Sequence, residues 1–404
     1  MKYLEWFIIF YLVIMIVFSL YMHFDNSKPV NIPDQAIQTA LMPHLPGQGS
    51  TAPLMPPGIK GPRFFVLENF EDGNTEPPKK EIIPSNGDFP DLEFPFKNIR
   101  DEKGQKLNIV AISAPFREVG HEEKYAAYKN AGYNILGISS YLEFPNEINN
   151  PHEDQFHKER KHDYISMVSS WLYCHRDPGY KLQYSGLPMM LMTEADLKNP
   201  DHYPKDPAIK PEYDFIYICL DDHDKGSEGE CKPGWNWYIR NWDLAKRCLE
   251  VMCEKFHLKG VIVGRSNCEF TDKCTGIVKT IPFLEYHNFQ KELQKCRFLF
   301  APNGSDASPR VIVEAMLYDK PVLVNYNIVG GWHNVIPGVT GETFTSEYDV
   351  DVAIQKILGN YANYTPRKWY MENRGIHHSG KKLAKFLKET YPNLNHPEME
   401  FAYI

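Results

Sequence analysis

Short apolar runs alternate with helical segments along most of this 404-residue chain, and this alternation constrains the fold more than any other feature. Residues 107–115 are apolar and bounded by polar residues, 122–133 are rich in helix formers, and 134–144 are largely apolar again. A strand, a helix and a second strand in this order predict a right-handed crossover in a parallel α/β sheet. Farther along, we expect a helix in 165–174 and a strand in 187–197.

A second alternating stretch begins at residue 213. Its apolar runs predict strands, and the segments between them have the apolar spacing of helices. The predicted strands are 213–221, 260–267, 275–284, 297–304 and 320–325, and the predicted helices are 237–256, 283–296 and 311–319. This pattern predicts a doubly wound nucleotide-binding sheet, whose ligand lies at the carboxyl ends of the strands.

Length, composition and charge exclude several classes of protein. A hydrophobic fraction of 43% and a charged fraction of 24% are typical of globular proteins and not of disordered or collagen-like chains. The length is that of two domains with additional segments. The formal net charge of −8 provides no basic surface that would neutralise phosphates, so we expect no nucleic-acid partner.

The N-terminal region contains an uncharged apolar run at 6–22. As a helix this run is about 25 Å long, which suits a single membrane span, and we interpret 1–24 as a transmembrane signal anchor. A cleaved signal peptide and a buried core helix are the alternatives, but no small-x-small cleavage site follows the run. Lys2 and Lys28 nearly balance across it, so the positive-inside rule leaves the orientation open.

Residues 25–62 contain eight prolines among Gly, Ser, Gln and Asn. Such a segment buries too little apolar surface to offset its ordering entropy, so it is predicted to be an extended, mobile stem. An anchor followed by a stem is expected of a membrane-held enzyme or of a tethered binding domain.

The cysteines and the glycosylation sequons bear on the compartment. The eight cysteines include no C-x-x-C pair, so we expect no zinc cluster, whereas disulfides remain an alternative. Two sequons begin at Asn303 and Asn363. Because a glycan on Asn303 would obstruct the segment that carries the candidate chemistry, the sequence favours a cytosolic catalytic part. Both sides of the membrane, the Golgi or ER lumen and the cytosol, remain alternatives.

The candidate chemistry is concentrated in 297–345. A strand leads to Asp306 in a loop, and Glu314 follows eight residues later in a helix. Two carboxylates with this spacing can face one cleft, where a carboxylate that accepts two hydroxyls can hold a ribose or another sugar.

The residues between these carboxylates favour an anion. Ser308 is expected to cap the helix, and Pro309 suits its first position. The open N–H groups of Arg310 and Val311, with the helix dipole, then face an anion. After the next strand, the glycine pair 330–331 allows close approach of the backbone to a ligand.

Together these features resemble the C-terminal signature of GT-B glycosyltransferases, most closely family 4, the retaining nucleotide-sugar enzymes. The matched positions lie in register: Asp306-Ala307-Ser308-Pro309-Arg310-Val311, Glu314-Ala315-Met316, Asp319-Lys320-Pro321-Val322, Gly330-Gly331, and Gly338 to Gly341. The amino-acid sequence of the motif, with DASPR and NYNIVGGW, is similar to that of enzymes from algae and large algal viruses.

The resemblance implies an α/β chain with two Rossmann-like doubly wound domains that face a cleft. It implies an acceptor-side domain at 63–212, a nucleotide-sugar-binding domain at 213–365, and a C-terminal helical segment at 366–404 that crosses back to the first domain.

The resemblance also implies roles for individual residues. Glu314 would bind the ribose, and Asp306, which is one methylene shorter than the family's glutamate, would contact the transferred sugar. Ser308, Pro309, Arg310 and Val311 would cradle the diphosphate, with Gly330 and Gly331 close by.

The family places an Arg and a Lys after the first strand of this domain, where this chain has Asp221 and Asp222. The candidates that could supply the lost positive charge are Lys232, Arg240, Arg265 and Arg310.

The implied activity is transfer of a sugar from a UDP- or GDP-linked donor to a hydroxyl of a glycan, glycoprotein or glycolipid. The transfer is expected to proceed with retention, without metal and without a further cofactor; the Asp-His-Asp run at 222–224 is discounted as a metal site. The alternatives are a catalytically inactive sugar- or nucleotide-binding protein and a nucleotide-sugar epimerase. The predicted anchor argues against an epimerase, because a soluble substrate needs no tether.

Overall fold

The computed structural model describes residues 91–404, apart from 141–143, 146–161, 183–184, 222–232 and 266–267. The predicted anchor and the predicted stem lie outside the described residues. Within the described part of the chain, no helix is both long enough and apolar enough to cross a membrane.

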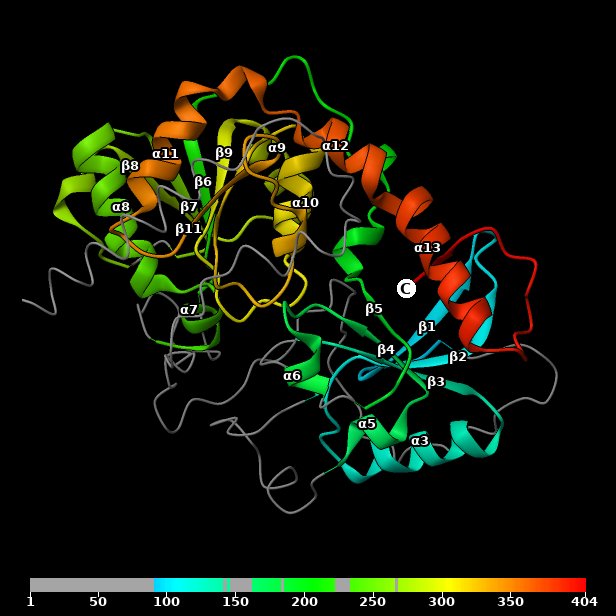
Figure 1. The fold of residues 1–404 in the computed structure, drawn as a ribbon. Helices are drawn as coiled ribbons and strands as arrows, with labels where there is room; N and C mark the ends of the chain where they lie inside the picture. Colours follow the sequence, from blue (N-terminus) through cyan, green and yellow to red (C-terminus); the bar gives the residue numbers. More distant parts are fainter. Residues whose placement is uncertain (1–90, 141–143, 146–161, 183–184, 222–232, 266–267) are drawn as a thin grey trace, which may run out of the picture. The chain divides into compact units, whose positions relative to one another are not determined.

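The first sheet has the order β12-β1-β2-β3-β4-β5, so it joins the described strands nearest the N-terminus to a strand from the end of the chain (Figure 1). Strands β2 to β5 are parallel, whereas β1 runs antiparallel to both β2 and β12. The strands are β1 Phe96–Asp101, β2 Lys106–Ile112, β3 Asn134–Ile138, β4 Ser170–Tyr173, β5 Met189–Leu191 and β12 Ala402–Tyr403.

Both faces of this first sheet are covered by helices. Because side chains alternate along a strand, Leu107 and Ile109 of β2 face one cluster and Val110 and Ile112 face the other. The first cluster includes α13, which comes from the end of the chain, and the second includes α3 and α5. The helices are α3 Val119–Asn130, α5 Tyr164–Met167, α6 Pro178–Leu182 and α13 Gly375–Thr390.

The second sheet is parallel throughout, in the order β11-β10-β9-β6-β7-β8. Counted from β6, this is the strand order of the Rossmann fold, with its switch point between β6 and β9. The strands are β6 Tyr213–Ile218, β7 Gly260–Val263, β8 Val278–Ile281, β9 Cys296–Ala301, β10 Val322–Asn325 and β11 Gly341–Phe344. The expected doubly wound sheet is therefore present.

Helices cover both faces of the second sheet (Figure 1). One core cluster joins the strands to α8 and α11, and the other joins them to α10 and to Tyr370 of α12. The helices are α7 Trp235–Ile239, α8 Trp242–Phe256, α9 Tyr286–Gln294, α10 Arg310–Leu317, α11 Val350–Gly359 and α12 Pro366–Asn373. Short 3-10 turns are η4 Asp272–Cys274, η5 Trp332–Asn334 and η6 Tyr361–Asn363.

Two predicted helices differ from the structure. The segment 165–174 is not one helix, because its second half is β4, which pairs with β3 and β5 on its two sides. The predicted helix 237–256 is interrupted at Asn241, whose left-handed backbone (φ 54°) separates α7 from α8. Asparagine tolerates this conformation better than most residues do.

Two connections join the sheets. The linker from β5 to β6 contains η2 Glu194–Leu197 and η3 Pro200–His202. Near the end of the chain, α12 packs with the second sheet, α13 packs on the first sheet, and β12 pairs with β1. Figure 1 shows α13 beside β1 and β2.

Candidate functional site

The candidate side chains follow the two strands at the switch point of the second sheet. In doubly wound sheets, ligands bind outside the carboxyl ends of the strands at this position. Strand β9 ends at Ala301 and leads through a loop into α10, which carries Glu314. Strand β6 leads to α7, and Arg240 follows that helix directly.

The loop that carries Asp306 packs directly on the glycine pair. A Cβ added to Gly330 would lie 1.8 Å from the carbonyl oxygen of Ala307, and one added to Gly331 would lie 2.4 Å from the Pro309 ring. The N–H of Gly330 donates to the Asp306 carbonyl at 2.9 Å. The close approach that these glycines permit is therefore to this loop, where the sequence had suggested a ligand.

Asp306 lies between a guanidinium and an amide. Arg240 Nη1 and Asn303 Nδ2 both donate to Asp306 Oδ2, the second at 3.1 Å. The structure thus brings one of the candidate bases, Arg240, to the carboxylate that the motif singles out. Both partners retain some exposure, at 25% for the Arg240 side chain and 13% for that of Asp306.

Glu314 is buried, and one of its oxygens accepts three donors. Lys198 Nζ lies 3.3 Å from Oε1, Tyr286 Oη lies 3.1 Å away, and Tyr203 Oη lies 3.5 Å away. The two tyrosine hydroxyls also lie 2.9 Å from each other. All these contacts are to Oε1, and no described residue forms a hydrogen bond with Oε2.

The hydroxyls beside Glu314 are held in their neutral form. Burial and the negative charge of Glu314 raise the pKa of Tyr286 to about 12, and the same causes raise the pKa of Tyr203 farther. Both hydroxyls therefore keep their protons at neutral pH. Because each has a single proton, Tyr286 donates to the carboxylate at 3.1 Å and Tyr203 donates either to Tyr286 or to the carboxylate.

Ser308 and Arg310 contact the linker that comes from the first sheet. Ser308 Oγ accepts the backbone N–H of Ala195 at 3.1 Å, so Ser308 does not cap α10 as expected; Pro309 is the N-cap residue, not the first helical one. Arg310 Nη2 lies 3.3 Å from Glu194 Oε2 in η2. The sequence predicts that Ser308 and Arg310 cradle a diphosphate. In the structure their side chains contact the linker.

Glu194 lies between two cations. Its carboxylate pairs with Lys97 of β1 and with Arg310 of α10. Burial acts to raise the pKa of Glu194, but the two cations outweigh it, and the pKa lies below its usual value. This carboxylate therefore stays ionised and connects the first strand, the linker and α10.

Asp196 is the centre of a buried network on the other side of η2. It accepts hydrogen bonds from Asn334 Nδ2 at 2.8 Å and from the Thr193 N–H at 2.7 Å, and His333 Nε2 lies 2.9 Å away. Burial raises the pKa of Asp196, but His333 and the amide donors lower it more, to about 2. The network fixes η2 against η5.

The strand ends of the two sheets also meet at Arg176. Its Nη2 donates to the Tyr326 carbonyl at 2.8 Å, and its guanidinium lies over the rings of Tyr326 and Trp332, 4.2 and 4.6 Å from their centroids. Trp332 Nε1 donates to the Cys174 carbonyl at 2.8 Å. The segment after β4 therefore contacts the segment after β10.

The remaining candidates lie elsewhere. Arg265 is fully buried, and its guanidinium lies over Trp237 and Trp242 and donates to the Leu220 carbonyl at 3.1 Å. This position is in the core and does not fit the expected contact with a ligand.

Lys232 lies outside the described residues. Across the described residues, no cluster of His, Cys, Asp and Glu has the arrangement of a metal site.

No protein-family model matches the chain, and no curated protein is significantly similar to it. Among solved structures, the chain is similar to Anabaena HepE in complex with UDP and glucose (12% identity, 69% of this chain and 78% of that chain, TM-score 0.49). It is also similar to S. aureus TarM (12%, 69% and 54%, TM-score 0.48) and to the lipopolysaccharide outer core galactosyltransferase WaaB (12%, 69% and 75%, TM-score 0.45). The two strand orders given above define the fold.

The three residues that surround Glu314 are not indicated by the motif. Lys198 and Tyr203 belong to the linker, and Tyr286 begins α9, so all three lie far from the motif along the chain. Only the position of Tyr286, shortly after strand β8 of the second sheet, could have suggested a place at the site.

Proposed function

We propose that this chain is a GT-B glycosyltransferase, similar to family 4, which transfers a sugar from a UDP- or GDP-linked donor to a hydroxyl of a glycan, glycoprotein or glycolipid. One observation carries the proposal: Asp306 and Glu314, eight residues apart, both follow the switch-point strand β9. Arg240 lies on the first carboxylate, and the linker from the other sheet lies on the second.

The contacts of Glu314 support a role in holding the ribose. Lys198 and the two tyrosines fix Oε1, while Oε2 has no hydrogen-bond partner among the described residues. A carboxylate that is oriented through one oxygen can accept ribose hydroxyls with the other. The charge-assisted bonds to these hydroxyls would be about twice as strong as neutral ones.

The diphosphate would lie at the start of α10. The first N–H groups of a helix have no intrahelical acceptor and carry the positive end of the helix dipole, so Arg310 and Val311 suit an anion. Arg240 would add a positive charge once the donor competes with Asp306 for it. The nucleoside diphosphate would then leave with stabilisation by these groups, while the acceptor attacks from the same face with retention.

We further propose that the chain is attached to a membrane through its N-terminal segment. It rests on the apolar run at 6–22 and on the proline-rich segment 25–62, which would hold the catalytic part away from the bilayer.

A panel of UDP- and GDP-sugars tests the proposal. We expect at least one donor to bind and to release its nucleotide, with the sugar recovered on an acceptor glycan by mass spectrometry. Glu314→Gln should abolish most of this turnover. The matched control is Glu342→Gln, because Glu342 in β11 is also a buried, hydrogen-bonded glutamate. Tyr364 and the Gly338 N–H donate to it, and Lys356 pairs with it at 3.7 Å.

Two results would contradict the proposal. Tight nucleotide binding without turnover of any donor would indicate an inactive binding protein. Conversion of the nucleotide-sugar into its epimer without transfer would indicate an epimerase.

A further inference from the structure

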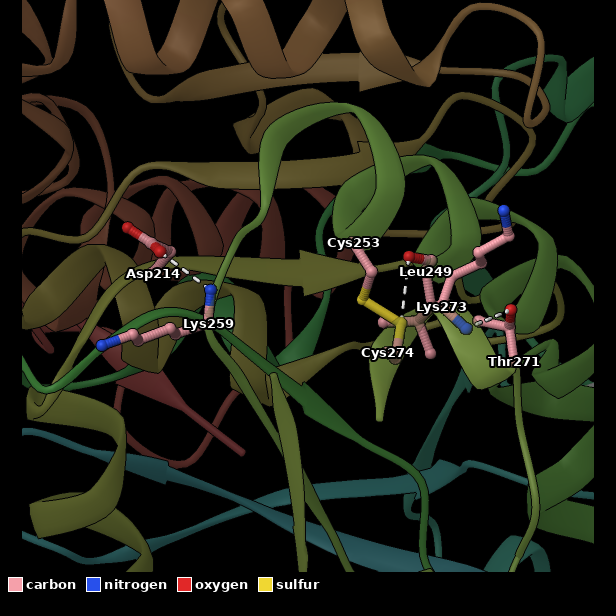
Figure 2. Close-up of a disulfide and its surroundings, with 7 residues drawn as sticks. All are labelled: Asp214, Leu249, Cys253, Lys259, Thr271, Lys273 and Cys274. Carbon is pink, nitrogen blue, oxygen red and sulfur yellow. Dashed lines mark hydrogen bonds between the residues drawn. A yellow bond between two sulfur atoms is a disulfide. The ribbon is translucent and has the colours of Figure 1, made fainter. Parts of the chain in front are cut away.

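A disulfide joins helix α8 to the turn η4 beside the second sheet. Cys253 in the last turn of α8 is bonded to Cys274 in η4, with a Cα–Cα distance of 5.2 Å and a sequence separation of 21 (Figure 2). Both sulfurs are in the hydrophobic core that α8 forms on this sheet. Structural disulfides persist in oxidising compartments and are rare in the cytosol, where thiols are kept reduced.

The sequon that begins at Asn303 is buried in the fold. Asn303 is only 2% exposed, and its Nδ2 donates to Asp306 Oδ2 at 3.1 Å. The nitrogen that would carry a glycan is therefore engaged in the loop after β9, and a glycan there would have no space. Because its asparagine is buried in the fold, the absence or presence of a glycan at this sequon gives no information about the compartment.

The asparagine of the sequon that begins at Asn363 is exposed to solvent. Asn363 ends η6, between α11 and α12, and its side chain is exposed. Its backbone N–H donates to Asn360, whereas its side-chain amide has no hydrogen-bond partner among the described residues. Thr365, the third residue of the sequon, is also exposed. A sequon in an exposed turn is the form that N-glycosylation uses.

We propose that the described part of this chain matures in the lumen of a secretory compartment, where Cys253 and Cys274 are joined and Asn363 carries an N-linked glycan. This reverses the cytosolic preference drawn from Asn303 in the sequence. If residues 1–24 are a signal anchor, as the sequence predicts, their N-terminus lies in the cytosol. The inference does not depend on the proposed glycosyltransferase activity.

Both modifications have defined chemistry. In glycosylation, Asn363 Nδ2 bonds to the anomeric carbon of an oligosaccharide carried on a lipid diphosphate; the carbon–oxygen bond to the diphosphate breaks, the lipid diphosphate leaves, and the amide loses a proton. In disulfide formation, the two thiols lose two protons and two electrons, which an oxidised protein disulfide accepts by exchange.

The test uses the full chain expressed in eukaryotic cells with a secretory pathway. We expect treatment with an amidase that removes N-glycans to lower the apparent mass of the unaltered chain. Asn363→Gln and Thr365→Ala remove the same sequon by different changes, and both should abolish the shift. Ser305→Ala, which removes only the sequon of Asn303, is the matched control and should keep the whole shift.

Peptide mass spectrometry provides the second readout. After thiols are blocked without reduction, the peptides that contain Cys253 and Cys274 should be recovered as a linked pair, and reduction should separate them. Absence of the glycan on the unaltered chain, its persistence in Asn363→Gln or Thr365→Ala, or blocked free thiols at both cysteines would each overturn the proposal.

Discussion

At the scale of single residues, the position of Glu314 depends on donors from other parts of the chain. The carboxylate is 5% exposed, so it would be costly to bury without partners, and Lys198 supplies a compensating positive charge. Tyr203 and Tyr286 then fix which oxygen faces them. The result is a buried, oriented carboxylate with one oxygen left for a ligand.

We predict that Glu314→Gln weakens binding of free UDP or GDP by ten- to a hundredfold. The change keeps the shape but removes charge-assisted hydrogen bonds worth about 1.5–3 kcal/mol, which corresponds to that range of affinity. Calorimetry with the nucleotide alone measures the effect, and Glu342→Gln provides the control for loss of a buried glutamate. Equal weakening in the control would assign the effect to general destabilisation.

Asp306→Asn should have a different effect. If Asp306 contacts the transferred sugar, free nucleotide should bind within about threefold of the unaltered affinity, a difference under 1 kcal/mol, while turnover of the intact donor falls. Calorimetry beside a turnover assay separates the two quantities. A matching loss of nucleotide affinity in both carboxylate variants would show that their roles are not divided in this way.

At the scale of elements, the turn η2 ties the first sheet to the second. Glu194 pairs with α10 through Arg310, Ser308 accepts the Ala195 N–H, and Asp196 binds η5. Two consecutive residues of this short turn, Glu194 and Ala195, thus contact the segment that carries the motif, and the third, Asp196, contacts η5. We infer that η2 sets the position of the candidate donor site relative to the first sheet.

Asp196→Asn should reduce stability at neutral pH more than at acid pH. The folded-state pKa of Asp196, about 2, lies below the ordinary value of 3.8. Its contribution to stability is therefore nearly complete above about pH 5 and is lost as the pH falls through 3.8 to about 2. The shift corresponds to about 2 kcal/mol. Urea unfolding at pH 7 and at pH 3 measures the difference between variant and unaltered chain, which should narrow at pH 3; a difference independent of pH would contradict the assignment.

At the scale of the whole molecule, the end of the chain completes the first domain. Leu383, Ala384 and Leu387 of α13 pack on the face of the first sheet that α3 and α5 leave open, and β12 adds a strand at the edge of this sheet. Residues 402–403 are therefore neighbours of 100–101 in one sheet. The first domain cannot bury both faces of its sheet without the C-terminal segment.

Leu387→Ala should destabilise the first domain by about 2–5 kcal/mol, since Leu387 is fully buried in this contact. Lys385→Ala lies on the exposed side of the same helix and should change stability by less than about 0.5 kcal/mol. Amide hydrogen exchange locates the effect: protection should fall in β2 and β3 and stay unchanged in β9 and β10. Equal loss in both sheets would mean that the domains unfold as one unit.

Much of the architecture could be predicted because its signals are local. Buried parallel strands are apolar runs, and their helices have a period of 3.6 residues, so the alternation in 107–144 and 213–325 predicts α/β sheets correctly. The spacing of Asp306 and Glu314 places one carboxylate after β9 and the other one turn into α10, which is also a local matter of strand, loop and helix.

Tertiary contacts decided the rest, because they join residues that no local pattern connects. Pairing with β3 and β5 makes 170–173 a strand, although the segment was predicted to be helical. Contact with η2 turns Ser308 away from its expected capping role, and burial between two tryptophans places Arg265 in the core. The surroundings of Glu314 come from segments 28 to 116 positions away, and only the packing of the folded chain brings their charges and hydroxyls to one carboxylate.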